Sequence, residues 1–162
     1  MLNYPDSLPD YSSGKRIKYM KAQYNLKRFT DAQESKFQNA LNEIKNGRKQ
    51  SHWMWFIFPQ IAGLGFSETA KFYAIKNIEE ASLYLQHPVL ASRLIEISQA
   101  LLEIEGKSAN QIFGSPDDLK LKSSMTLFSS VGDTNSVFET VLEKYFNGTK
   151  DLKTLQIIQG QK

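Results

Sequence analysis

The run of residues 51–60 carries the densest set of side chains that could do chemistry. It holds His52, both tryptophans of the chain (Trp53 and Trp55) and Gln60. Histidine is the side chain that most readily exchanges a proton near neutral pH, so His52 could act as a general acid or base facing a pocket. The alternative is a histidine whose ring nitrogens are satisfied by backbone groups inside a crowded core. The pattern leaves both interpretations open.

The aromatic residues of the same run also allow two interpretations. Trp53 and Trp55 could form a stacking platform for a base or another flat ligand. Aromatic side chains at this spacing more often fill a core. We therefore expect most of these rings to pack inside the protein, with one tryptophan lining a pocket.

A second polar run, residues 120–126, lies inside a segment with the pattern of an amphipathic helix. Serine and threonine are unfavourable in helix interiors because their hydroxyls compete for backbone groups. Ser124 stands three residues after Leu121 and four before Phe128, so it should face the core. Such hydroxyls either allow close helix packing or bind a polar ligand, with Lys120 or Lys122 meeting an anion. Both alternatives stay open.

A serine becomes a nucleophile when a base such as a histidine lies within hydrogen-bonding reach, which a sequence cannot show. The question of catalysis therefore stays open, with two candidate catalytic residues, His52 and Ser124. The candidate ligand-binding residues are Trp53, Trp55, Gln60, Lys122 and Ser123.

Several classes of chemistry are excluded or disfavoured. The chain has no cysteine, which rules out disulfides, thiol catalysis and thiolate metal sites. Its two histidines, His52 and His87, lack the spacing of a metal motif, so no metal site is expected. Gly63-Leu64-Gly65 lacks the third glycine of a dinucleotide fingerprint and the ending of a P-loop. No cofactor is predicted.

The charge distribution argues against nucleic acid as a partner. The net charge is +3, but residues 1–28 hold six of the 20 basic and two of the 17 acidic side chains, so the remainder is slightly acidic. Nucleic-acid-binding folds normally carry their basic stripe on the folded domain. The start of the chain shows no basic-then-apolar signal pattern, and no apolar run approaches ~18 residues. We expect a cytoplasmic protein that does not enter a membrane.

Helix signals recur along the chain, whereas the alternation of a half-buried strand does not. We expect a basic, flexible extension over residues 1–24 and a single all-α domain of seven or eight short helices over residues 25–160. The signals are helix starts at Thr30, Ser51, Ser67, Asn77, Pro88, Ser108, Ser115-Pro116, Asp133 and Asp151, and stops at Gly47, Pro59, Gly106 and Gly114.

Several of these runs resemble one known family. Residues 47–60 followed by Gly63-Leu64-Gly65, residues 84–90, Ile112-Phe113-Gly114 and residues 122–128 are similar to the bacterial and fungal domain-of-unknown-function family eighteen-ten, over residues 25–158. The resemblance implies a compact all-α protein of the fold seen in a mycobacterial hypothetical protein, and it implies no activity. Lys122 stands where the family commonly has arginine, and a lysine holds an anion less specifically.

These observations favour a small all-α protein that binds a small, anionic ligand. Its pocket would lie between residues 52–60 and 122–126, the two runs in which polar side chains gather. The alternative is an interaction module without chemistry, which would expose aromatic side chains such as Trp53 or Phe66 in a patch several hundred Å² in area. The identity of a protein partner is left open.

Overall fold

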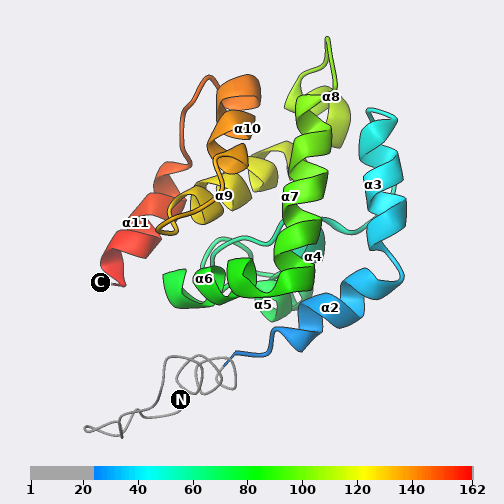
Figure 1. The fold of residues 1–162 in the computed structure, drawn as a ribbon. Coiled ribbons are helices and arrows are strands. Elements are labelled where there is room, and N and C mark those ends of the chain that lie inside the picture. The colour runs from blue at the N-terminus through cyan, green and yellow to red at the C-terminus, as the bar shows by residue number, and fades with distance from the viewer. Residues whose placement is uncertain (1–23, 162) are drawn as a thin grey trace, which may run out of the picture.

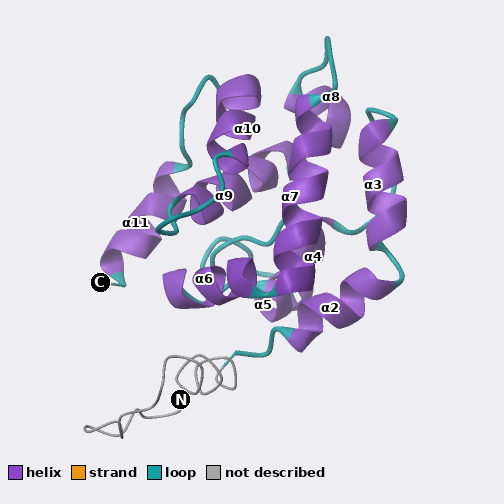
Figure 2. Cartoon of the chain, in the orientation of Figure 1, coloured by secondary structure: helices purple, strands orange, loops and turns teal. Residues whose placement is uncertain are grey.

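The computed structural model describes residues 24–161, which form ten α-helices and no strand (Figure 2). The expected all-α class is confirmed, while the expected count of seven or eight helices is wrong for the part of the chain that the structure describes. The helices are α2 (Lys27–Glu34), α3 (Phe37–Lys45), α4 (Met54–Ile57), α5 (Glu68–Tyr73), α6 (Ile78–Gln86), α7 (Pro88–Leu102), α8 (Ala109–Phe113), α9 (Asp117–Ser129), α10 (Val137–Phe146) and α11 (Leu152–Gly160).

Helix α7 is the longest element and stands at the centre of the fold, with α3 and α10 on its two sides (Figure 1). Helix α9 contacts α6, α8, α10 and α11. The core that these helices enclose is rich in aromatic rings. Its largest fully buried side chains are Trp53, Tyr84, Phe29, Phe58, Phe128 and Phe138.

One expected helix is two helices in the structure. We expected a helix that starts with a cap at Thr30 and ends at Gly47. Instead α2 begins at Lys27, and the chain breaks at Ser35 before α3 starts. The buried amide of Gln33 donates to the carbonyl oxygen of Phe56 and to the hydroxyl of Tyr84. These long-range bonds tie the end of α2 to the core, and a short-range pattern cannot reveal them.

Most of the expected helix caps are confirmed. The side chains of Ser67, Asn77, Ser108 and Asp151 each accept a bond from a backbone N–H three residues on, and Nδ1 of His87 accepts from the first turn of α7. Three further starts differ. Ser51 does not cap α4, and α9 begins at Asp117, one residue later than expected, without a side-chain cap from Ser115. Helix α10 begins at Val137 rather than at Asp133, because Asp133 takes the left-handed conformation, with φ 57°.

The expected extension over residues 1–24 lies outside the described residues, except for Tyr24. That residue is buried, and its hydroxyl contacts Asn77 and Glu79 near the start of α6. No helix between residues 24 and 161 has the length and apolar character needed to cross a membrane. The expected cytoplasmic location stays a prediction.

Candidate functional site

Glu43 of α3 organises the loop that leads into the tryptophan run. Its carboxylate accepts hydrogen bonds from the backbone N–H groups of Gln50 and Ser51, from the hydroxyl of Ser51 and from the indole N–H of Trp53. Burial raises the pKa of Glu43, but these four bonds outweigh burial and lower the pKa to about 2. The carboxylate is therefore ionised near neutral pH and fixes the loop in one conformation.

The two tryptophans occupy different environments. Trp53 is fully buried, and its ring packs against Phe58 and Phe113. Trp55 is half-buried and lines a cavity together with Gln60. This cavity has a volume of only about 10 Å³, roughly the space of one water molecule. Trp53 is thus a core residue, and Trp55 and Gln60 share a space too small for an organic ligand.

Two lysines and one aspartate join the tryptophan run to the start of α9. Nζ of Lys49 lies 3.0 Å from one carboxylate oxygen of Asp117, and Nζ of Lys120 lies 3.4 Å from the other. The same two ammonium groups lie over the rings of Trp53 and Trp55, at 5.0 and 5.2 Å from the ring centroids. Lys120 therefore brings the two polar runs together, and Asp117 already partners both cations.

The remaining polar residues of α9 face α11 instead. The hydroxyl of Ser123 donates to the carboxylate of Asp151, and the hydroxyl of Thr126 accepts from the backbone N–H of Asp151. Asp151 also accepts from the backbone N–H and the hydroxyl of Thr154. Lys122 extends over the ring of Phe146. These contacts attach the start of α11 to α9.

The two candidate catalytic residues do not contact each other. His52 is exposed, whereas the hydroxyl of Ser124 is fully buried and has no hydrogen-bond partner within the described chain. The bond from serine to histidine that would activate a nucleophile is absent between these two side chains. Between residues 24 and 161 no group of three or more carboxylate or imidazole side chains is arranged to hold a metal ion.

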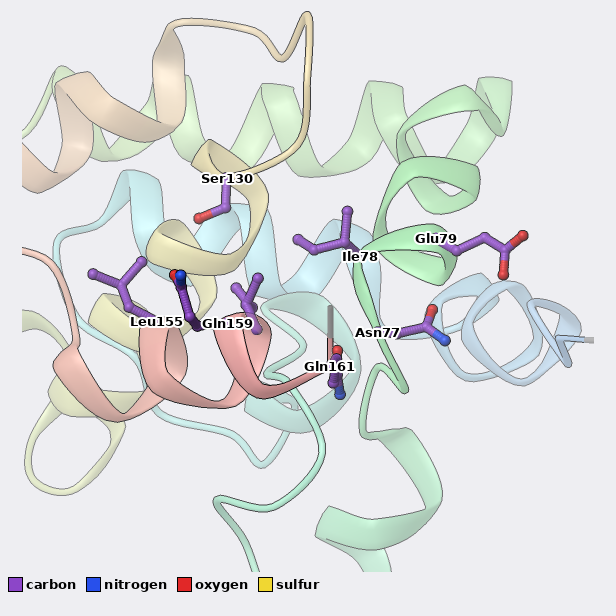
Figure 3. A pocket seen from close by; sticks show the side chains of 8 residues that line it. Asn77, Ile78, Glu79, Ser130, Leu155, Gln159 and Gln161 are labelled. Carbon is purple, nitrogen blue, oxygen red and sulfur yellow. The ribbon is translucent and has the colours of Figure 1, made fainter.

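A larger hollow, with a volume of about 490 Å³, lies between the start of α6, the end of α9 and α11 (Figure 3). Ile78, Leu155 and Ile158 form its apolar part. Ser130, Gln159 and Gln161 are among its polar lining residues, and the carboxylate of Glu79 points away from Leu155 and Gln159. We call this space the α6–α11 pocket.

A buried ion pair positions the α6 side of this pocket. Nη1 of Arg28 lies 2.9 Å from the carboxylate of Glu80, and both side chains are almost fully buried. Arg28 also donates to the carbonyl oxygens of Asn25, Phe72 and Ala74. One arginine thus holds α2, the segment after α5 and the first turn of α6 together.

Sequence reasoning missed Glu43, Asp117 and the α6–α11 pocket. Glu43 and Asp117 are charged residues on helices, where a sequence pattern predicts a solvated face. The pocket combines side chains from three separated segments, each with an ordinary helical pattern. No local sequence pattern indicates the contacts of Glu43 and Asp117 or the presence of the pocket.

Comparison with known proteins agrees with the resemblance seen in the sequence. A family model described as protein of unknown function (DUF1810) matches residues 23–158. The fold is similar to the crystal structure of the conserved hypothetical protein Rv1873 from Mycobacterium tuberculosis, with a TM-score of 0.83 and 45% sequence identity. That match covers 85% of this chain and 98% of the mycobacterial chain. A search of curated proteins found no match.

Proposed function

This chain belongs to the DUF1810 family of proteins of unknown function, and we propose that it binds a small, uncharged molecule in the α6–α11 pocket. The observation that carries the proposal is the pocket itself. Its volume of about 490 Å³ lies within the range of ~300–1,000 Å³ that is typical of small-molecule sites. Its apolar residues and a few polar groups match the usual composition of such sites.

The polar groups of the pocket favour an uncharged ligand. The exposed side chain of Gln159 forms no hydrogen bond within the part of the chain that the structure describes, so its amide offers both a donor and an acceptor. Gln161 donates to the carbonyl oxygen of Lys76, which leaves its own oxygen free to accept. No lysine or arginine is among the described lining residues, so a phosphate would find no cation there. A glutamine amide pairs well with a planar ring that carries a donor beside an acceptor, such as a nucleobase.

The anion site expected between residues 52–60 and 122–126 stays a prediction. Lys49 and Lys120 are the cations nearest to the tryptophan rings, and Asp117 neutralises part of their charge. Ser123 is engaged with Asp151. An anion at this place would have to compete with these contacts, which is why we favour the α6–α11 pocket.

The test is a calorimetric titration with adenine, cytosine, nicotinamide and the nucleosides and nucleotides that contain them. We expect at least one uncharged ring to bind, and its phosphorylated form to bind no better. Gln159→Leu should weaken binding about tenfold because the site loses one uncharged amide that forms hydrogen bonds with the ligand. Gln156→Leu is the matched control, since Gln156 is exposed on the same helix and does not line the pocket.

Tryptophan emission distinguishes this pocket from the tryptophan run, because both tryptophans lie in residues 51–60. A ligand that changes the emission saturably and whose binding is lost in His52→Ala would place the site at the tryptophan run and refute our proposal. Failure of every compound to bind would also refute it.

A second function, that of a protein-interaction module, is favoured by the surface around α5. Phe66 is 79% exposed and Phe72 54% exposed, and α5 has no buried residue. Large apolar side chains at the surface often mark contact sites. We propose a second copy of the chain as the partner. Sedimentation equilibrium should then show self-association that is lost in Phe66→Ser and Phe72→Ser, and a monomer at all concentrations would contradict this.

A further inference from the structure

Tyr24, the first residue that the structure describes, is attached to one wall of the α6–α11 pocket. Its hydroxyl contacts the side chains of Asn77 and Glu79, and both of these residues line the pocket. The side chain of Tyr24 is buried, and Nζ of Lys76 lies 5.8 Å from the centroid of its ring. Residues 1–23 therefore join the described fold at the wall of this pocket.

The pocket has an incompletely covered apolar side and a single charge. Two of its apolar lining residues, Ile78 and Leu155, remain partly exposed to solvent. Covering them with apolar side chains is favourable because it removes apolar surface from water. Glu79 is the only charged residue among the described lining residues. The pocket therefore suits a segment that combines apolar side chains with positive charges.

The sequence shortly before Tyr24 has this composition. Residues 15–21 read Lys-Arg-Ile-Lys-Tyr-Met-Lys, with four cations and no acidic residue. Ile17 and Met20 stand seven and four residues before Tyr24, a spacing that places three side chains on one face of a helix. Amphipathic helices bind apolar grooves through side chains at this spacing. We call residues 15–21 the basic segment.

We propose that the basic segment covers the α6–α11 pocket, with Ile17 and Met20 against the apolar lining residues and the lysines on the side of Glu79. The attachment of Tyr24 puts the pocket within reach. Four residues of chain span at most about 14 Å and seven residues at most about 25 Å, so both apolar side chains can enter it. The occupant is thus a part of this chain.

The consequence is a pocket that its own chain regulates. This consequence rests on the function proposed above, whereas the binding of the basic segment does not. A small molecule has to displace the segment, so its apparent affinity falls in proportion to the fraction of molecules in which the pocket is open. Loss of Ile17 and Met20 should therefore strengthen ligand binding, by about fivefold if the segment covers the pocket in four molecules of five.

The first test uses the full chain without any ligand. Nuclear Overhauser spectra of protein with ¹³C-labelled methyl groups should show contacts from the methyl group of Met20 to those of Ile78, Leu155 and Ile158. The Met20 signal is identified by its loss in Met20→Leu. Contacts to the surface around α5 in place of the pocket would overturn the inference, as would the absence of contacts to the pocket. Contacts that form between labelled and unlabelled chains in a mixture would reveal a second copy and would overturn it too.

The second test compares affinities. Ile17→Ser combined with Met20→Ser removes the apolar side chains of the basic segment and keeps its four cations. Leu2→Ser combined with Leu8→Ser is the matched control, since it makes the same kind of change outside the segment. In the calorimetric titration, the first variant should bind about fivefold more tightly than the original protein, and the control should bind equally well.

The outcomes separate this inference from the proposed function. Equal affinity of all three proteins for a compound that binds would overturn the regulatory role of the segment and leave the proposed function intact. Failure of every compound to bind all three proteins would refute the proposed function, and the methyl contacts of Met20 would still decide whether the basic segment covers the pocket.

Discussion

Replacing Glu43 by glutamine should destabilise the protein by about 3 kcal/mol at neutral pH, and most of this difference should disappear in acid. Burial raises the pKa of Glu43, but hydrogen bonds from the hydroxyl of Ser51, from two backbone N–H groups and from the indole of Trp53 lower it from 4.5 to about 2. The gap between these two pKa values corresponds to about 3 kcal/mol of free energy of unfolding. Glu43 is 8% exposed, so solvent screens these bonds little.

The direction of the pH dependence follows from the sign of the shift. The folded-state pKa of Glu43 lies below its unfolded value, so the folded state favours the ionised carboxylate. The stabilisation is fully present above a pH of about 4.5 and is lost as the pH falls toward about 2. Glutamine cannot ionise, so the variant lacks this contribution at every pH. The difference in stability between the two proteins should therefore narrow across that interval.

Urea denaturation followed by tryptophan emission measures this difference directly, because Trp53 is buried beside Glu43. The two proteins should differ by about 3 kcal/mol near pH 7 and by about half as much near pH 3. Glu96→Gln is the control, since Glu96 is exposed on α7 and its replacement should change the free energy of unfolding little. If the free energies of unfolding of Glu43→Gln and the original protein differ by the same amount at both pH values, the reasoning is refuted.

Three further predictions concern other contacts. Arg28→Met should cost about 3–5 kcal/mol in urea denaturation because it leaves the buried carboxylate of Glu80 without its cation, and a double variant that adds Glu80→Gln should regain part of the loss. Asp151→Ala should cost about 1–2 kcal/mol by calorimetry because it removes the cap of α11 and its link to α9, and an unchanged melting temperature would contradict this. Phe66→Ser should change the free energy of unfolding by less than about 0.5 kcal/mol, whereas Phe138→Ala should cost about 3–5 kcal/mol; equal effects would show that their burial is misassigned.

The residues of the candidate sites were harder to predict than the fold, and α9 shows why. The run at residues 120–126 stands out in the sequence because hydroxyls are unfavourable inside a helix. The sequence does not show what these hydroxyls bind, since the partner of Ser123 is Asp151, 28 residues away. The link between the two polar runs is made by Lys120, one helical turn before Ser124, and depends on how α9 crosses the tryptophan run.

The all-α class and most helix boundaries were already determined at the level of the sequence, because they depend on interactions within about four residues. The capping box at Ser108 and the cap at Asp151 are such interactions. The tertiary structure decided which polar groups are engaged and which remain available. Arg28 and Glu80 are 52 residues apart, and the α6–α11 pocket is lined by segments distant in the chain. Such contacts depend on the path of the whole backbone, which no local pattern of residues specifies.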